Sequence, residues 1–275
     1  MTAARFIRSS IVYIILIVAA VMVLYPLAYT FLSSFMTPEE SSAYPPKMLP
    51  SGLYLGTFQE VLELVPLGAF IGNSFVISLA IMGGQVLTAS MAAYAFVYVT
   101  FRGRALLFAV VLSTMMIPWE ITMIPNYLTI KSWEWLDRYP GLIVPFLASA
   151  FGIFLLRQFF LQLPRELFEA AKMDGCGHVR HFVRIVLPLS RPALASLAVY
   201  TFLNAWNMYL WPLLVTSSDT MRTVQIGISM LQFEEMTSWN LVLAGVTLVL
   251  LPSLLLLMLG LKQLVGGLTA GAIKG

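Results

Sequence analysis

Charged residues are scarce in this chain: they make up 11% of its 275 residues, whereas 59% are hydrophobic. One core cannot hide so many apolar side chains, so the composition excludes a soluble domain of this length and indicates a membrane protein. The chain has a single cysteine, which excludes an internal disulfide framework, and no Cys and His residues are grouped at metal-ligand spacing. We therefore expect this chain to hold no metal and no cofactor.

The sequence also lacks the G-x-x-x-x-G-K-[ST] pattern of a P-loop. The chain is therefore not expected to hydrolyse nucleotides or to be an enzyme. Its basic residues are dispersed over short loops and do not gather in one stretch, so its net charge of +3 does not indicate a nucleic-acid partner.

Long stretches without charged residues are the main feature of the sequence. A helix needs about 20 apolar residues to cross a bilayer. The sequence predicts an all-α membrane protein with six transmembrane helices and one permease-sized domain over residues 1–275. The predicted spans cover about 11–32, 70–98, 105–119, 139–156, 192–215 and 240–261. An even number of spans places both termini on one side.

The distribution of positive charge orients these spans. Four basic residues, Lys47, Lys131, Arg138 and Arg222, fall on one side. The other 12 of the 16 fall on the side of the termini; they are Arg5, Arg8, Arg102, Arg104, Arg157, Arg165, Lys172, Arg180, Arg184, Arg191, Lys262 and Lys274. The positive-inside rule makes this side, with both termini, cytoplasmic.

A charged segment, residues 163–188, interrupts the apolar second half of the chain. Pro164 is suited to open a helix, and Gly175 lets the chain turn before a second short helix from about His178 to Val186. The segment is therefore predicted to be a cytoplasmic helix-turn-helix. Phe168, Ala171 and Lys172 share one side of its first helix, where we expect a surface that contacts another protein.

The spacing within this segment is similar to a known motif. Glu169-Ala170-Ala171, three residues, Gly175, nine residues, Ile185, one residue and Leu187-Pro188 resemble the EAA loop of ATP-binding-cassette (ABC) importer permeases. In that family the loop docks on the ATPase subunit. The resemblance implies coupling to an ATPase through Glu169, Ala170, Ala171, Asp174, Gly175, Ile185, Leu187 and Pro188.

Two further stretches, residues 204–214 and 267–275, resemble the second permease of carbohydrate importers of the maltose type. Residues 116–120 and 156–160 also look like the glycerol-3-phosphate branch. The resemblance implies a second homologous permease, two copies of an ATPase that uses ATP and Mg²⁺, and an extracytoplasmic solute-binding protein. It also implies the plasma membrane of a prokaryote, and a tail at 266–275 that reaches toward the ATPase.

Polar residues in the fifth predicted span are candidates for the solute pathway. Asn204, Asn207 and Trp211 recur at i, i+3 and i+7, which places two amides and an indole on one helix face. Polar groups at membrane depth usually face a bundle interior or a cavity, although hydrogen bonding between helices explains them equally well. Glu120, after Pro118, is a further candidate if its carboxylate turns inward. Asn73, Gln85 and Ser149 are weaker candidates and are better explained as helix contacts.

These observations favour the permease subunit of an ATP-driven importer for a sugar or oligosaccharide. No Lys or Arg falls inside a predicted span, which favours a neutral solute, but a glycerol-3-phosphate importer remains an alternative. A secondary transporter or channel is an alternative of another class. It is disfavoured because no ionisable residue falls near the middle of a predicted span.

Overall fold

The computed structural model describes residues 3–232 and 238–269, and every regular element within these ranges is helical. The chain divides into two compact units. The first is formed by Met1–Leu67 and Gly227–Leu251, and the second by Gly68–Ile226 and Pro252–Gly275. The boundaries between the two units fall after Leu67, Ile226 and Leu251. The single permease domain over residues 1–275 stays a prediction.

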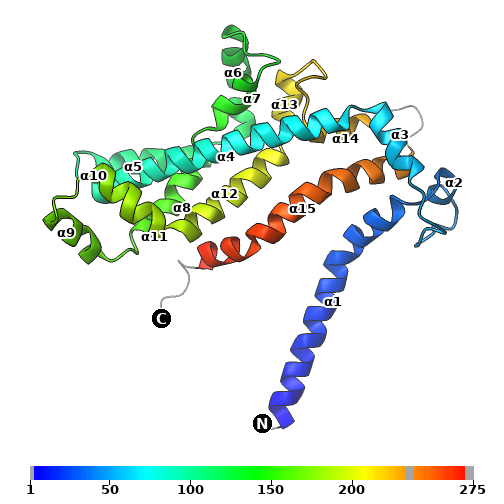
Figure 1. Cartoon of the computed structure of the whole chain (residues 1–275), viewed down its shortest axis with the longest axis horizontal. Helices are drawn as coiled ribbons and strands as arrows, with labels where there is room; N and C mark the ends of the chain where they lie inside the picture. The colour runs from blue at the N-terminus through cyan, green and yellow to red at the C-terminus, as the bar shows by residue number, and fades with distance from the viewer. Residues whose placement is uncertain (1–2, 233–237, 270–275) are drawn as a thin grey trace. The chain divides into compact units, whose positions relative to one another are not determined.

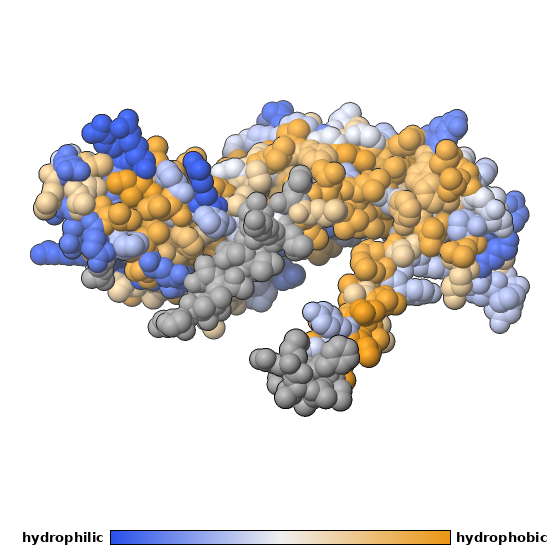
Figure 2. Space-filling view, turned by 60° about the horizontal axis from the view of Figure 1, so that its bottom comes forward, coloured by the Kyte–Doolittle hydropathy of each residue, from blue (hydrophilic) through white to orange (hydrophobic). Residues whose placement is uncertain are grey.

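The first unit contains α1 (Ala3–Ser33), α2 (Pro38–Ser41), α3 (Gly56–Leu64) and the first part of α15 (Trp239–Thr269). Most apolar side chains of α1 from Ile11 to Tyr25 are exposed, and they give this helix its hydrophobic surface in Figure 2. A long apolar helix with such exposed side chains is suited to contact lipid or another membrane protein.

A short loop after α1 is held by the carboxylate of Glu40. The Thr37 hydroxyl accepts a hydrogen bond from the Glu40 N–H, and the Glu40 carboxylate accepts one from the Thr37 N–H, which is a capping box. Glu40 Oε1 also accepts from the Ser51 N–H at 3.2 Å and from Lys47 Nζ at 2.9 Å. Hydrogen bonds from Ser51 and then Lys47 hold the pKa of Glu40 at about 2, because they stabilise its charged form.

The second unit is built around α4 (Leu67–Tyr98). Its other elements follow in chain order: α5 (Arg104–Ser113), η1 (Thr114–Met116), α6 (Trp119–Ser132), α7 (Tyr139–Ile143), η2 (Val144–Phe146), α8 (Ala150–Phe160), α9 (Arg165–Met173), α10 (His178–His181), η3 (Phe182–Val186), α11 (Leu187–Leu189), α12 (Arg191–Trp206), α13 (Leu210–Val215) and the start of α14 (Val224–Met230). Figure 1 shows α9 and α10 together at one end of this unit, away from α6, α7 and α13.

Two hydrophobic clusters fix helices against α4. Ala89 and Ala93 pack with Leu156 of α8 and Leu197 of α12. The approach is close at Gly152 of α8, where an added Cβ would lie 3.2 Å from the Ala89 Cβ and 3.3 Å from Leu197. Small residues thus let these helices come together, as is common in membrane bundles.

The second cluster lies along another part of α4. Ile77 and Ile81 pack there with Ile130 of α6, Leu142 of α7 and Trp211 of α13. This cluster holds α6, α7 and α13 against α4.

The predicted spans correspond to a mixture of straight and bent segments. Three helices, Ser9–Ser33, Leu67–Tyr98 and Trp239–Met258, are long and apolar enough to cross a membrane. Three bent pairs each have the composition for one more span: Arg104–Met116 with Trp119–Ser132, Tyr139–Phe146 with Ala150–Phe160, and His178–Leu189 with Arg191–Trp206, bent by 97°, 43° and 77°. The described residues thus offer up to six spans, the number that the sequence predicts.

Two proline residues account for the largest departures from the predicted boundaries. The third span was expected to continue to Trp119, but α5 ends at Ser113 and Ile117 is extended before Pro118. The fifth span was expected to continue to Val215, but α12 ends at Trp206 and α13 begins at Leu210. In an uninterrupted helix the Pro212 ring would clash with the carbonyl of Met208.

Candidate functional site

The charged segment, residues 163–188, has the helix-turn-helix form that its sequence predicts. After α9 the N–H groups of Asp174 and Cys176 donate to the carbonyls of Ala170 and Ala171, at 3.0 and 2.8 Å. Gly175 adopts a φ of +71°, a conformation open to glycine but strained for residues with a side chain. The chain then enters α10. Because Pro188 has no N–H, regular α-helical bonding is interrupted near this residue, and a π-helical turn covers Phe182–Val186.

The exposed surface of α9 differs from the predicted one. Leu167, Glu169 and Ala170 are exposed, whereas Ala171 is buried and Phe168 packs against the rings of Tyr98 and His181. Phe168 and Ala171 therefore face the protein and do not form the predicted contact surface with Lys172. Figure 2 shows hydrophilic residues gathered at this end of the second unit.

The residues of the ABC motif lie on both parts of the segment. Glu169, Ala170, Asp174 and Gly175 are exposed on or just after α9, and Ala171 is the buried member. Ile185 and Leu187 are half-buried and Pro188 is exposed, around η3 and α11. The Glu169 carboxylate is thus exposed on α9, and Val186, between the motif residues Ile185 and Leu187, packs in the cluster around Ala89 and Ala93.

A tyrosine hydroxyl attaches this segment to α4. Tyr94 Oη lies 3.1 Å from Nδ1 of His178 and 3.1 Å from Nδ1 of His181, which is 2% exposed. One imidazole can accept the hydroxyl proton while the other donates its own N–H to the same oxygen. Sequence reasoning missed this contact, because nothing in the apolar window around Tyr94 indicates a polar partner 84 residues away.

A cavity of about 450 Å³ lies between α4, α8 and α12 of the second unit. We call it the α12 cavity. Aromatic rings form much of its wall: Trp119, Phe146, Phe151 and Tyr200. Polar groups line it as well, namely Gln85, Ser149, Thr201 and Asn204, and its other lining residues are Ile81, Ala205 and Met208. No lining residue carries a charge.

Several of these polar groups are held by contacts inside the protein. Gln85 Nε2 donates to the Phe146 carbonyl at 2.8 Å, and Gln85 Oε1 accepts from Thr201 Oγ1 at 3.1 Å. Ser149 Oγ caps α8 by accepting from the Gly152 N–H at 3.2 Å. Gln85 and Ser149 are thus helix contacts, as expected, but they also line the cavity.

The three predicted pathway residues of the fifth span do not share a face. Asn204 is exposed and lines the α12 cavity, whereas Asn207 follows the end of α12 and does not line it. Trp211 is 1% exposed, its Nε1 donates to the Gly141 carbonyl at 3.0 Å, and its ring packs against Trp119 and Phe146. The helix break described above separates Trp211 from Asn204 and places its indole behind the cavity wall.

Two charged residues near this region lie outside the cavity lining. Glu120 is exposed in the first turn of α6, where the helix dipole favours a carboxylate. Arg157 lies inside α8, which continues to Phe160 and so passes the predicted end of the fourth span at 156. Its guanidinium carbon lies 4.1 Å from the centre of the Phe108 ring. Arg157 therefore lies in the last turn of α8, one residue beyond the predicted span, and it does not line the cavity. That no Lys or Arg lies inside a span stays a prediction.

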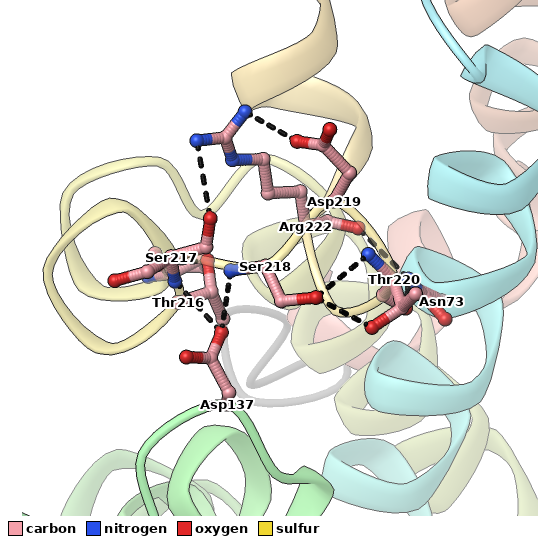
Figure 3. Close-up of polar contacts among 9 residues, drawn as sticks. Asn73, Asp137, Thr216, Ser217, Ser218, Asp219, Thr220 and Arg222 are labelled. Atoms are coloured by element: carbon pink, nitrogen blue, oxygen red, sulfur yellow. Dashed lines mark hydrogen bonds and ion pairs between the residues drawn. The ribbon is translucent and has the colours of Figure 1, made fainter.

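A loop after α13 is held to α4 and to the start of α7, as Figure 3 shows. Asp137 Oδ1 accepts from the N–H groups of Ser217 and Ser218 at 2.7 and 2.8 Å. Asn73 Nδ2 donates to the carbonyls of Thr220 and Arg222 at 2.8 and 3.0 Å, and Asn73 Oδ1 accepts from Tyr139. The amide of Asn73 is therefore a contact that positions this loop.

Comparisons with known proteins identify the fold and the family. Residues 84–265 match the family model of the binding-protein-dependent transport system inner membrane component. The sn-glycerol-3-phosphate transport system permease protein UgpE of Pectobacterium atrosepticum is 38% identical over 264 residues, 93% of this chain and 94% of that protein. The protein of the same name from Brucella melitensis is 36% identical over 273 residues, 96% and 97% of the two chains.

Solved structures show the same fold. A chain of a bacterial ABC transporter involved in the import of the acidic polysaccharide alginate superposes with a TM-score of 0.82 at 21% identity. The match covers 95% of this chain and 98% of that chain. A chain of the alginate transporter in complex with an alginate pentasaccharide-bound periplasmic protein gives a TM-score of 0.65 at 17% identity, over 94% of both chains. Together with the relatives, these findings exclude an unrelated secondary transporter or channel. The chain belongs to the family of binding-protein-dependent transport system inner membrane components, and it is a permease of an ABC importer.

Proposed function

We propose that this permease couples ATP hydrolysis by a separate subunit to the import of a sugar or oligosaccharide. The observation that carries this proposal is the segment 163–188: an exposed carboxylate, Glu169, on a short helix followed by a glycine turn. Closure of a pair of ATPase subunits around ATP and Mg²⁺ would move this segment. The movement would pass through the contact of Tyr94 with the two histidines into α4.

The proposed assembly contains a second homologous permease, two ATPase copies and an extracytoplasmic solute-binding protein. It would reside in the plasma membrane of a prokaryote with both termini in the cytoplasm. Membership in a binding-protein-dependent transport family supports the solute-binding protein. Tyr200, Asn204 and Asn207 leave polar groups exposed on and just after a membrane helix, which supports a water-filled pathway or a second permease beside α12. The tail 266–275 would contact the ATPase. Residues 270–275 of this tail lie outside the described ranges.

For the solute, two candidates are favoured by different observations. The uncharged lining of the α12 cavity favours a neutral sugar, with Asn204 as the pathway residue that lines it. Asn207, just after α12 and outside the lining, is a weaker pathway candidate. Trp211, as part of the wall behind, and Glu120, at the start of α6, remain weaker pathway candidates. The names of the relatives favour sn-glycerol-3-phosphate as the second candidate. A phosphate dianion would need cations to offset its desolvation, and the partner permease would have to supply them.

The coupling part of this proposal is tested by charge reversal on α9. Glu169→Lys should lower both ATP-driven uptake and solute-stimulated ATP hydrolysis at least about tenfold, because it replaces attraction to a basic residue of the ATPase by repulsion. Glu166→Lys, at an exposed carboxylate outside the motif, is the matched control and should have a much smaller effect. Equal, wild-type rates for both variants in the assembled complex would show that Glu169 does not transmit the coupling.

The solute part is tested by calorimetric titration of the cognate solute-binding protein. Tight binding of a neutral sugar supports the first candidate. Tight binding of sn-glycerol-3-phosphate with no affinity for neutral sugars selects the second.

A further inference from the structure

The free hydrogen-bonding groups of the α12 cavity are all neutral. Asn204 Nδ2 donates to the Tyr200 carbonyl one helical turn earlier, at 2.8 Å. This contact uses one of the two N–H groups of Nδ2 and leaves the other N–H and the acceptor Oδ1 without a partner among the described residues. The Tyr200 hydroxyl likewise has none among them. It can both donate and accept.

This neutral lining discriminates between solutes. A hydroxyl group can donate to Asn204 Oδ1, but a phosphate dianion has only acceptor oxygens and would be repelled by it. The donors that the lining leaves free, the Tyr200 hydroxyl and one N–H of Asn204 Nδ2, are neutral and would compensate a phosphate dianion only weakly. With no cation in the lining, a dianion would lose its hydration without replacement.

The aromatic walls of the α12 cavity fit the apolar C–H surface of a sugar. The rings of Phe151 and Tyr200 lie 4.7 Å apart, centre to centre, and those of Trp119 and Phe146 lie 4.9 Å apart, so two aromatic pairs border the cavity. Aromatic faces suit the apolar C–H surface of a sugar ring. The volume of about 450 Å³ falls within the range of about 300–1,000 Å³ that is usual for small-molecule sites.

The cavity wall is also held in place before any solute arrives. Thr201 and Phe146 fix Gln85, and Thr88 Oγ1 donates to the Leu147 carbonyl at 2.7 Å, so α4 is joined to the segment before α8 by two side-chain hydrogen bonds. Trp211 supports the wall from behind through its bond to Gly141. A pre-formed wall lowers the ordering cost of binding.

We propose that the α12 cavity is a solute subsite for one neutral sugar ring, with Asn204 Oδ1 accepting from a ring hydroxyl and the Tyr200 ring stacking on the sugar. This inference rests on the proposed importer function and specifies where this chain contacts the solute. It also predicts that Asn207, an amide on the same segment outside the cavity, contributes much less.

The chain offers a matched pair of variants. Asn204 and Asn207 are both exposed, and each Nδ2 donates to the backbone carbonyl four residues earlier at 2.8 Å. The complete importer is reconstituted in proteoliposomes with its solute-binding protein, and uptake of ¹⁴C-labelled glucose, maltose, maltotriose and sn-glycerol-3-phosphate is measured. Asn204→Ala should lower sugar uptake about tenfold, the loss expected for a solute hydrogen bond, while Asn207→Ala stays within about twofold.

A chemical test reports occupancy directly. Cys176 is the only cysteine, so Cys176→Ser gives a background without thiols in this chain. In that background the transported sugar should slow modification of the Asn204→Cys variant by a water-soluble methanethiosulfonate, and should leave Asn207→Cys unaffected. A purely structural role of Asn204 would not produce this protection.

The possible results separate the subsite from the proposed function. The subsite would be wrong if Asn204→Ala and Asn207→Ala lowered sugar uptake equally, or if the sugar did not protect Asn204→Cys from modification. The importer function would stand in both cases. ATP-driven uptake of sn-glycerol-3-phosphate alone would overturn the neutral-sugar assignment. Failure of the wild-type complex to import any of the four probes would contradict the proposed function itself.

Discussion

The indole Nε1 of Trp211 donates a hydrogen bond to the carbonyl oxygen of Gly141 at 3.0 Å. This bond joins α13 to α7, and it is fully enclosed because Trp211 is 1% exposed. Gly141 has no room for a larger residue, since a Cβ there would collide with the carbonyl of Trp135. The contact therefore fixes α13 to α7 and holds the Trp211 ring against Trp119 and Phe146 of the α12 cavity.

Removal of this bond should destabilise the permease. Trp211→Phe keeps an aromatic ring but leaves the buried Gly141 carbonyl unpaired, at a cost of about 1–3 kcal/mol. Trp206→Phe is the control, because Trp206 is equally buried but its Nε1 has no hydrogen-bond partner among the described residues. Thermal unfolding of the purified complex should show the larger decrease for Trp211→Phe. Equal decreases would mean that loss of ring volume, and not the hydrogen bond, dominates.

The turn in residues 163–188, the proposed coupling segment, should tolerate substitution at Gly177 and not at Gly175. Gly175→Ala places a Cβ at a φ of +71°, and such strain costs about 1–3 kcal/mol. Gly177→Ala is neutral by this criterion, because Gly177 has a φ of −69° and no atom within 4 Å of an added Cβ. Solute-stimulated ATP hydrolysis of the reconstituted complex should fall for Gly175→Ala alone. A similar loss in both variants would point to a direct contact of this surface with a partner, and away from turn strain.

The Tyr94 hydroxyl should restrain the coupling segment. Tyr94→Phe removes both contacts to the imidazoles of His178 and His181 and leaves the ring packing in place. Amide hydrogen exchange in residues 165–181 should therefore become faster. Tyr98→Phe is the control, because the Tyr98 hydroxyl donates to the Phe160 carbonyl in α8, at 3.2 Å, and not to this segment. Unchanged exchange in Tyr94→Phe would show that packing alone holds the segment.

The loop around Glu40 should loosen in acid. The pKa of Glu40 is lowered from the ordinary 4.5 to about 2, so its charged form stabilises the folded loop. That contribution is complete above pH 4.5 and is lost as the pH falls through about 2. Hydrogen exchange at Thr37 and Ser51, corrected for the intrinsic pH dependence, should rise over this interval in the wild type. In Glu40→Gln it should already be high at neutral pH, whereas Glu60→Gln on α3 should behave as the wild type. A flat wild-type profile between these pH values would contradict the role of Glu40.

The coupling segment was the part most open to sequence reasoning. Its features are local: a proline that precedes a helix, charged residues on α9, and Gly175 at a turn that requires positive φ. Local conformational rules act over a few residues, so they can be read directly from the chain. The transmembrane spans could be predicted for the same reason, because each follows from a continuous apolar stretch of the sequence.

The α12 cavity could not be predicted in the same way. Gln85 and Thr201 are 116 residues apart, and their contact depends on how α4 packs against α12. Asn204 and Trp211 are at helical spacing, and periodicity alone placed them on one face. Pro212 was the available signal against this arrangement, because a proline interrupts the helix one turn before its own position.

ATP dependence of uptake is the most direct test of the central claim, that this chain is the permease of an ATP-driven importer. The complete complex is reconstituted in proteoliposomes with ATP and Mg²⁺ on the side of the ATPase subunits, and accumulation of labelled sugar is followed in the presence of the solute-binding protein. The account predicts accumulation above the external concentration that stops when a non-hydrolysable ATP analogue replaces ATP or when the binding protein is omitted. Accumulation that persists without ATP hydrolysis and follows an imposed proton or sodium gradient would contradict it.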